Sequence, residues 1–376
     1  MKKRILICGG GTAGHIYPAV SVIEEILENH KDFDLLYIGT DKGLEKKIIE
    51  KLGINFKMVR AAGLIQRGNP AKKLINYIKF IFNLTSGFLS SIKLIKTFDP
   101  GIILGMGGYV CAPVLLSAVF LRKRFVLHEQ NFIPGRLNKF FSKFCYRIFI
   151  SFEDTGQFLN INTGKIVFSG NPVRKIIREA SNKKPDYAKF GLVGGKFTIT
   201  AFGGSLGADK INNSFIKLYE KLKDREDVQF LLISGSRFYE DFKMKNINTL
   251  KNSYSLKVFP YVDEMDEIYS LTDLLISRSG ANTIAEIAFC NIPAILIPYP
   301  WAIDNHQYYN ASFLEKNGKA IILNDKNLND EGLYNIFVDL EKENKKLYND
   351  LKYKKTDFNF MNGHKTLTKF LVGEKN

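Results

Sequence analysis

The stretch that decides the fold is RILICGGGTAGH, residues 4–15. A short apolar run ends at three consecutive glycines, and apolar residues at helical spacing follow over residues 19–27. This order predicts a strand, a tight glycine-rich turn and then a helix. The glycines also satisfy the GxGxxG spacing, which is typical of a loop that places backbone amides and a helix N-terminus beside a phosphate.

The same arrangement recurs twice along the chain. Ile102–Leu104 runs into the glycine-rich loop 105–108, and Phe197–Phe202 runs into the loop 203–207. Other short apolar runs alternate with helical stretches, at residues 35–38, 125–127, 230–233, 274–277 and 294–297. Strands and helices that alternate in this way predict an α/β fold, in which parallel sheets are covered by helices on both faces.

Two domains follow from where the pattern restarts. It begins again near Phe197, after the polar stretch 181–186, and Gly170-Asn171-Pro172 offers a hinge just before that stretch. We expect two Rossmann-like, doubly wound domains, 1–170 and 171–357, with a helix at about 358–376 packed back on the first. Such domains bind ligands at the carboxyl ends of their strands, so we expect them to face each other across a ligand cleft.

Composition bounds the partners of these domains. Hydrophobic residues make up 45% of the 376 residues and charged residues 24%, which excludes disordered and fibrous classes. The net charge of +16 indicates an anionic partner: nucleic acid, a phosphorylated substrate or an acidic membrane surface. Four scattered cysteines without a CxxC pair favour a reducing compartment. The longest strongly apolar stretch, Ala112–Leu121, is too short to span a bilayer, so we expect a cytoplasmic protein.

The glycine-rich loops favour a phosphate ligand, because three such loops in a basic chain exceed what turn formation requires. The first loop alone also allows a dinucleotide site, although no acidic residue clearly ends the second predicted strand, and Asp41 is the nearest. His15 stands at the first turn of the helix that follows the loop. It either faces whatever binds there or caps a turn.

Polar side chains cluster where predicted strands end. His128-Glu129-Gln130-Asn131 follows the run 125–127, and four polar residues there suit a cleft wall better than a core. Arg278–Glu286 opens a helix, in which Glu286 either accepts hydrogen bonds from a ribose diol or complements the helix dipole. A third cluster, Asp304-Asn305-His306-Gln307, is rich in groups that bind sugars.

The segment 64–96 has a different character. Its apolar and aromatic residues recur at helical spacing, and its polar positions are basic. This is typical of a helix that lies on an anionic bilayer, although a helix packed on the sheet with solvated lysines gives the same pattern. We expect membrane contact from Lys72, Lys73, Ile75, Ile78, Lys79 and Phe82.

Six motifs occur in one fixed order: GGTAGH (10–15), GMGGYV (105–110), HEQN (128–131), GNPVR (170–174), GGSLGA (203–208) and RSGANTIAE (278–286). With a match that runs to about Ala311, the chain resembles the MurG family of bacterial N-acetylglucosaminyltransferases. The resemblance implies a GT-B fold. It implies transfer of N-acetylglucosamine (GlcNAc) from UDP-GlcNAc to the 4-hydroxyl of MurNAc in undecaprenyl-pyrophosphoryl-MurNAc-pentapeptide (lipid I), which gives lipid II for peptidoglycan synthesis.

The same resemblance implies inversion at the anomeric carbon with no metal and no cofactor. The lipid acceptor and the membrane are expected on the N-terminal domain, and UDP-GlcNAc on the C-terminal domain. The protein is expected to be peripheral on the cytoplasmic face of the bacterial cell membrane. Its partners would be the anionic inner-membrane surface and cell-wall synthesis complexes, and not nucleic acid.

Individual site residues follow from the matched motifs. The resemblance implies that UDP-GlcNAc is bound by Thr12, Ala13, Gly14, Asn131, Arg174, Ser205, Val262, Ala281, Asn282, Thr283, Ile284, Ala285, Glu286 and Gln307. It places the acceptor diphosphate at Gly11, Gly107, Gly108 and Tyr109. Two residues depart from the family pattern: Ala13 replaces a glycine, and His306 replaces a glutamine.

Inversion by a single displacement needs a base that takes the proton of the attacking 4-hydroxyl. His15 is the first candidate and Glu129 the second. The charge that develops on the leaving UDP can be stabilised by backbone amides and Arg174 without a metal, and no carboxylate cluster suggests a divalent cation site.

Three other functions stay open at this point. A related transferase that acts on diacylglycerol would share the fold and the UDP-sugar site, but should lack the HEQN and GNPVR motifs. An NAD-dependent oxidoreductase is allowed by the first loop alone. A nucleic-acid-binding protein is suggested only by the charge.

Overall fold

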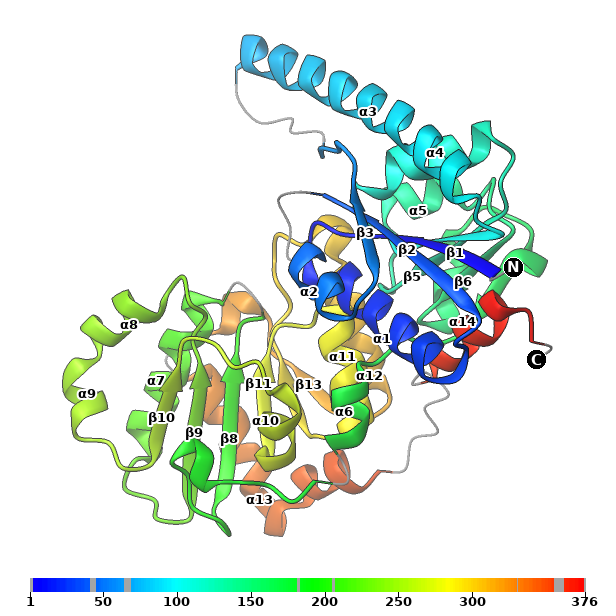
Figure 1. Cartoon of the computed structure of the whole chain (residues 1–376). Helices are drawn as coiled ribbons and strands as arrows, with labels where there is room; N and C mark the ends of the chain where they lie inside the picture. Colours follow the sequence, from blue (N-terminus) through cyan, green and yellow to red (C-terminus); the bar gives the residue numbers. More distant parts are fainter. Residues whose placement is uncertain are drawn as a thin grey trace. The chain divides into compact units, whose positions relative to one another are not determined.

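The computed structural model of the chain describes residues 3–40, 45–63, 69–180, 183–204, 207–329, 331–354 and 362–374. The chain divides into two units: unit 1 comprises Met1–Arg174 and Asn359–Asn376, and unit 2 comprises Lys175–Phe358. Each unit is built on one parallel sheet with helices between consecutive strands (Figure 1). The predicted α/β fold with two Rossmann-like parallel sheets is therefore confirmed.

Unit 1 contains a seven-stranded sheet in the order β3-β2-β1-β4-β5-β6-β7. Its strands are β1 (Lys3–Cys8), β2 (Phe33–Gly39), β3 (Asn55–Met58), β4 (Ile102–Gly105), β5 (Phe125–Glu129), β6 (Arg147–Ile150) and β7 (Ile166–Phe168). Its helices are α1 (Ala13–Asn29), α2 (Glu45–Lys51), α3 (Pro70–Phe98), α4 (Cys111–Phe120), α5 (Arg136–Phe141) and α14 (Gly363–Val372).

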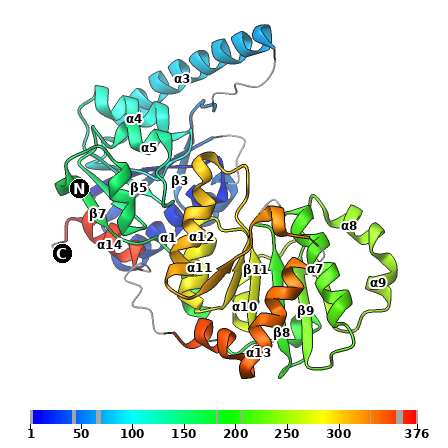
Figure 2. The same cartoon turned by 180° about the vertical axis from the view of Figure 1, so that it is seen from behind.

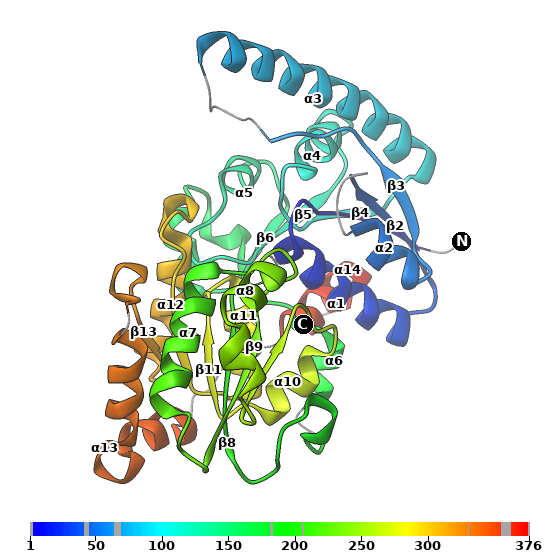
Figure 3. The same ribbon diagram turned by 90° about the vertical axis from the view of Figure 1, so that its left-hand side faces the viewer.

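Both faces of this sheet are buried because side chains alternate along each strand. In β1, Ile5 and Ile7 pack on one face against α1 and α14, whereas Leu6 and Cys8 pack on the other face against α4. The C-terminal helix α14 lies beside α1, where it contributes Leu367 and Leu371 to the core (Figure 3). The end of the chain is thus part of the first core.

Helix α3 has two halves with different environments. Its C-terminal half packs on α4, where Ser91 and Ile95 are buried and Gly87 lies so close to the Arg60 carbonyl that a side chain would collide with it. Its N-terminal half extends away from the sheet of unit 1 (Figure 1). Large apolar side chains on this half, such as Leu74, Ile78 and Phe82, are exposed.

Helix α3 also corrects an expectation drawn from the sequence. We expected no segment long enough to span a bilayer, but residues 71–98 form a 28-residue helix that is long and apolar enough to do so. The sequence misled because lysines interrupt the apolar run, so that no uninterrupted stretch is long, although an 18-residue window of the helix contains at most two charged residues and is apolar on average.

Unit 2 repeats the topology with a six-stranded sheet in the order β10-β9-β8-β11-β12-β13. Its strands are β8 (Phe197–Phe202), β9 (Val228–Ile233), β10 (Leu256–Phe259), β11 (Leu274–Ser277), β12 (Ala294–Leu296) and β13 (Ala320–Ile322). Its helices are α6 (Lys175–Ala180), α7 (Asp209–Leu222), α8 (Tyr239–Lys245), α9 (Ile247–Lys251), α10 (Met265–Leu271), α11 (Ala281–Cys290), α12 (His306–Lys316) and α13 (Gly332–Tyr353). Helices α7 and α13 share one hydrophobic core, while α11 contacts α6 and α12 (Figure 2).

The eight predicted strands are all present, and the five that the sequence did not predict are mostly edge strands. β3, β7, β10 and β13 are the outermost strands of the two sheets, and each is only partly buried. An edge strand needs few apolar residues because one of its sides faces solvent. Accordingly, β3 (NFKM) and β10 (LKVF) contain polar residues, whereas β7 (IVF) and β13 (AII) are apolar but only three residues long.

Candidate active site

The glycine-rich loops of unit 1 follow the two central strands of its sheet. β1 and β4 are hydrogen-bonded neighbours, with Cys8 paired to Gly105, yet their chain connections lead to opposite sides of the sheet. This reversal of strand order is the topological switch point, at which open α/β sheets bind their ligands. Both loops follow the carboxyl ends of their strands, as predicted from the glycines that come directly after the two apolar runs.

These two loops contact each other through their glycines. Gly107 and Gly108 have φ of +93° and +80°, and a side chain at Gly108 would collide with the Gly10 carbonyl. A side chain at Gly11 would come within 2.7 Å of the Tyr109 ring. Gly11 and Gly108 therefore pack against the opposite loop, Gly107 is buried, and a Cβ at any of the three glycines would collide with a neighbour.

His15 lies in the first turn of α1, against the second loop. Its Nδ1 is 3.0 Å from the Met106 carbonyl oxygen and 3.1 Å from Gln130 Oε1. A Cβ on Gly107 would stand 2.9 Å from the same nitrogen, so the glycine makes room for the imidazole ring. His15 is half-buried, as expected of a side chain held at the edge of a site.

The polar residues at the end of β5 correct a second expectation. We expected all four to line a cleft wall, but His128, Glu129 and Gln130 are at most 1% exposed. They are tolerated inside the unit because neighbouring backbone and side-chain groups satisfy them. Burial lowers the pKa of His128 from its ordinary 6.5 to about 4, so its ring is neutral at physiological pH.

Glu129 anchors the loop that follows β5. Its carboxylate accepts hydrogen bonds from the backbone amides of Asn131 and Gly135, both at 2.9 Å, and from the side chain of Asn138 at 2.8 Å. The Asn131 side chain adds a longer bond at 3.4 Å. These donors engage both carboxylate oxygens, an arrangement that suits an anchor better than a proton acceptor for a substrate.

The other predicted residues of unit 1 differ in their exposure and contacts. Thr12 and Gly14 are exposed, and Ala13 and Asn131 are half-buried. The Arg174 guanidinium stacks over the Tyr17 ring at 4.5 Å, and the Ser21 hydroxyl donates to the Val173 carbonyl at 2.6 Å. Val173 and Arg174, at the end of unit 1's first segment, are thus fixed to α1. Tyr17, which contacts Arg174, is two residues after His15.

Unit 2 repeats the switch point between β8 and β11, which pair from Leu274↔Ile199 to Ser277↔Phe202. The third glycine-rich loop follows β8, and Ser205 within it lies outside the described residues. Gly207 has a φ of +75°, and a side chain there would come within 2.5 Å of the Ser234 carbonyl oxygen. A glycine is therefore needed where this loop approaches the end of β9.

The segment after β11 starts α11, in which the predicted residues have different exposures. Asn282 and Thr283 are half-buried, whereas Ala281, Ile284 and Ala285 are buried in the core. Glu286 is 7% exposed and accepts a hydrogen bond from the Tyr269 hydroxyl at 2.8 Å. Val262 is also buried, at 8% exposed.

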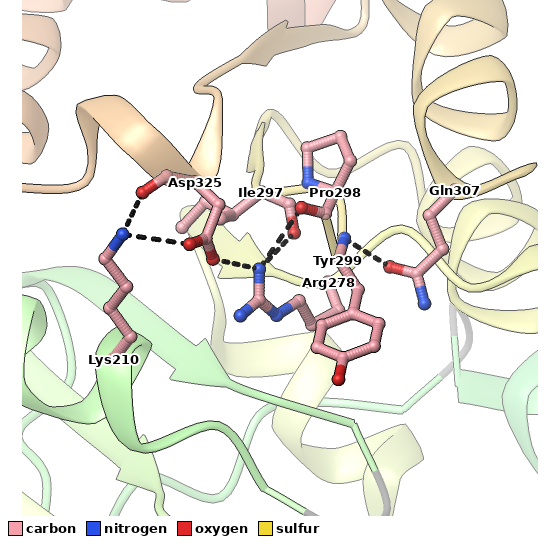
Figure 4. Close-up of polar contacts among 7 residues, drawn as sticks. All are labelled: Lys210, Arg278, Ile297, Pro298, Tyr299, Gln307 and Asp325. Carbon is pink, nitrogen blue, oxygen red and sulfur yellow. Dashed lines mark hydrogen bonds and ion pairs between the residues drawn. The ribbon is translucent and has the colours of Figure 1, made fainter. Parts of the chain in front are cut away.

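A charged cluster fixes the loops around this segment (Figure 4). Arg278 Nη1 donates to Asp325 Oδ1 at 2.7 Å and to the carbonyls of Ile297 and Pro298. Lys210, on α7, donates to Asp325 Oδ2 at 2.9 Å. Burial raises the pKa of Asp325, but the bonds from Lys210 and Arg278 outweigh it and leave this pKa below its ordinary value.

Gln307 lies next to this cluster at the start of α12. Its Oε1 accepts a hydrogen bond from the Tyr299 amide at 3.0 Å, which orients the amide nitrogen in the opposite direction (Figure 4). The Ser279 hydroxyl donates to the Gln307 carbonyl at 2.8 Å. These bonds join the loop after β12 to the start of α11.

Three residues that make contacts in these sites were not predicted from the sequence. Arg278 was part of a recognised motif but received no role, and its partner Asp325 follows the edge strand β13, which was not predicted. Tyr269 offers no signal, because a tyrosine in an amphipathic helix is ordinary. Within the described part of the chain, no group of three or more His, Cys, Asp or Glu side chains could hold a metal ion.

Comparison with known proteins defines the class first. Residues 5–150 match the glycosyltransferase family 28 N-terminal domain, and residues 198–367 match the glycosyltransferase family 28 C-terminal domain. The protein is therefore an enzyme of the glycosyltransferase class. This result decides against the nicotinamide interpretation of the first loop.

The relatives narrow the assignment. A protein of Finegoldia magna named UDP-N-acetylglucosamine–N-acetylmuramyl-(pentapeptide) pyrophosphoryl-undecaprenol N-acetylglucosamine transferase is 36% identical over 88% of this chain and 87% of its own. The protein of the same name from Caldanaerobacter subterraneus is 38% identical over 88% of this chain and 89% of its own. The crystal structure of Acinetobacter baumannii MurG has the same fold, with a TM-score of 0.73 over 99% of both chains at 24% identity. The chain belongs to the MurG family, as the six ordered motifs predicted.

Proposed function

We propose that this chain transfers GlcNAc from UDP-GlcNAc to the 4-hydroxyl of MurNAc in lipid I, which yields lipid II for peptidoglycan synthesis. The relatives support this, since their printed names specify this transfer and they match the chain over nearly nine-tenths of its length. The observation that carries the proposal is the position of His15, an imidazole in the first turn of α1 beside two mutually packed glycine loops.

In the proposed reaction the acceptor 4-oxygen attacks the anomeric carbon of GlcNAc. A carbon–oxygen bond forms at that carbon while the bond to the UDP phosphate oxygen breaks, and its electron pair leaves with UDP. The hydroxyl proton passes to the His15 ring, which acts as general base. His15 suits this role better than Glu129, whose carboxylate already accepts four hydrogen bonds.

The donor would be held chiefly by unit 2. We assign the diphosphate to the loop of Ser205 and to Arg174, because amides at a helix N-terminus and a guanidinium stabilise the charge that develops on the leaving group. The start of α11 (281–286) and the backbone of Val262 would hold the nucleoside, with Glu286 on the ribose hydroxyls. Gln307 would contact the sugar through its amide nitrogen, since its oxygen is bonded to Tyr299. Thr12, Ala13, Gly14 and Asn131 would complete the donor site.

The acceptor diphosphate would lie against the two loops that contain Gly11, Gly107, Gly108 and Tyr109. The positive φ of both Gly107 and Gly108 turns the backbone of the second loop, and consecutive amides in such turns form concavities that bind anions. This assignment also places the diphosphate next to His15, the group that must reach the acceptor sugar attached to it.

The N-terminal half of α3 would attach the protein to the cytoplasmic face of the membrane. Leu74, Ile78 and Phe82 form a stripe at i, i+4 and i+8, and these side chains are 61%, 59% and 60% exposed. Lys72, Lys73 and Lys79 accompany them, and Ile75 is also exposed. We favour a helix that lies on the surface over a span, because the other half of α3 is packed on α4. Cell-wall synthesis complexes at this membrane are its expected partners.

The proposal is tested by transfer of radiolabelled GlcNAc from UDP-GlcNAc, with a lipid I analogue and diacylglycerol as competing acceptors and with EDTA present. We expect product on the lipid I analogue despite the chelator. Product only on diacylglycerol would retain the family and reject the cell-wall role. If neither acceptor is labelled by the folded protein, the proposed function is wrong.

A further inference from the structure

A chain of hydrogen bonds runs from His15 into the interior of unit 1. It passes through Gln130 and His128 at the end of β5, and it ends on the backbone of Gly170. Neither Gln130 nor His128 can meet a substrate, since both are at most 1% exposed. A buried polar network of this kind is costly unless every member is satisfied, which raises the question of what it does.

The direction of each hydrogen bond can be worked out from the Met106 carbonyl oxygen, which can only accept. Gln130 Nε2 lies 2.8 Å from this oxygen and must donate to it, so the Gln130 side chain cannot be flipped. His15 Nδ1 lies 3.0 Å from the same oxygen and 3.1 Å from Gln130 Oε1, so it faces two acceptors and must carry a hydrogen. In a neutral imidazole the lone pair is then on Nε2.

The second hydrogen of Gln130 Nε2 extends the chain. It points to His128 Nδ1 at 3.2 Å, which must accept it. The hydrogen of neutral His128 is therefore on Nε2, which donates to the Gly170 carbonyl at 3.2 Å. The low pKa of His128, about 4, agrees with a neutral ring that can accept at Nδ1. The two histidines thus have opposite tautomers, each fixed by a backbone carbonyl.

We propose that Gln130 and His128 are positioning residues, which hold His15 in the Nδ1–H tautomer so that Nε2 is the atom that takes the acceptor's proton. This inference rests on the proposed role of His15 as general base. When Nε2 gains the proton, the positive charge spreads to Nδ1–H, and its bonds to Met106 and Gln130 Oε1 become charge-assisted and stronger. The network therefore stabilises the charged ring that forms during transfer.

Solution NMR of the whole chain labelled with ¹⁵N in its histidine rings tests the tautomers directly. The chain has five histidines, and spectra of His15→Ala and His128→Asn assign the two signals. At a pH where both rings are neutral, we expect His15 to show a protonated Nδ1 and an unprotonated Nε2, and His128 to show the reverse. A His15 ring protonated on Nε2 would overturn the proposal.

A double-mutant cycle tests the functional link. Gln130→Met removes the donors and the acceptor while keeping the shape, and we expect kcat to fall about tenfold with the KM for UDP-GlcNAc little changed. In the His15→Ala background the same substitution should lower kcat by less than about twofold, because Gln130 acts only through His15. A tenfold fall in both backgrounds would mean a merely structural role.

Ser151→Ala is the matched control. Ser151 is fully buried and its hydroxyl donates to the Glu129 carbonyl at 2.9 Å, but it does not touch His15. We expect its kcat to stay within about twofold of wild type. Failure of the wild-type chain to transfer GlcNAc would reject the proposed function, whereas an active wild type with an equally active Gln130→Met would reject only the positioning role.

Discussion

The two units fix the loops at their switch points with different chemistry. In unit 1, His15, Gln130 and His128 are joined by hydrogen bonds that end on backbone carbonyls. In unit 2, Arg278 and Lys210 converge on Asp325 as an ion-paired cluster. Hydrogen bonds to backbone carbonyls determine which ring nitrogen of a histidine carries the hydrogen, whereas an ion pair holds two loops together and involves no tautomer. The difference agrees with the proposed roles, in which unit 1 accepts a proton and unit 2 holds the anionic leaving group.

The largest effect should come from unit 1. We expect His15→Ala to lower kcat by about 10²- to 10⁴-fold, the range of general-base catalysis, because the other candidate base, Glu129, already accepts four hydrogen bonds. The affinity for UDP-GlcNAc, measured by calorimetry, should change little because the donor is assigned mainly to unit 2. A variant with near-normal turnover would remove His15 from the mechanism.

Membrane binding should also distinguish the units. Lys72→Glu, Lys73→Glu and Lys79→Glu together should weaken sedimentation with anionic vesicles at least about a hundredfold, since each lysine near such a surface contributes about 1 kcal/mol. The matched control is Lys243→Glu, Lys245→Glu and Lys251→Glu on unit 2, all exposed. It changes the net charge equally, so comparable weakening by both sets would assign the effect to total charge and not to α3.

The ion-paired cluster of unit 2 is tested by Asp325→Ala. Asp325 and Arg278 are 14% and 12% exposed, so the variant leaves a shielded guanidinium without its carboxylate. We expect the free energy of unfolding to fall by about 2–3 kcal/mol, less than for a fully buried pair because Lys210 is partly solvated. Urea denaturation measures this.

The control for this variant uses another ion pair of the same helix. Lys221, on α7 like Lys210, bonds to Glu331 at 2.6 Å, but Glu331 is 58% exposed. Glu331→Ala should change the free energy of unfolding by less than about 0.5 kcal/mol. Equal losses in the two variants would show that the Asp325 cluster has no special structural role.

The smallest effect should be a pH dependence located in unit 1. His128 has its pKa lowered to about 4, so between pH 6.5 and pH 4 the unfolded chain binds a proton that the folded chain does not. The contribution of neutral His128 to the free energy of unfolding is therefore fully present above pH 6.5 and is lost as the pH falls through that window. The loss should be about 2 kcal/mol between pH 7.5 and pH 5. His128→Asn lacks this proton, so urea denaturation should show a smaller loss over that range. Identical pH dependence in both proteins would contradict the assignment.

The sequence predicted the central strands of both sheets because they are buried on two faces and read as continuous apolar runs. It did not predict the edge strands such as β3 and β10, whose half-solvated residues carry no such signal. It also misjudged α3, because a count of consecutive apolar residues stops at each lysine, whereas the helix as a whole is long and apolar on average.

The amino-acid sequence by itself determined the family, the alternation of the inner strands with helices, and the turns that need glycine. Backbone conformation and apolar periodicity are local properties, which a short stretch of sequence records. Only the tertiary structure decided that Glu129 anchors a loop, that Gln130 connects two histidines, and that Arg278 and Asp325 form an ion pair. His15 and Gln130 are 115 residues apart, and Arg278 and Asp325 are 47 apart, so these contacts are a property of the packing that no stretch of sequence records.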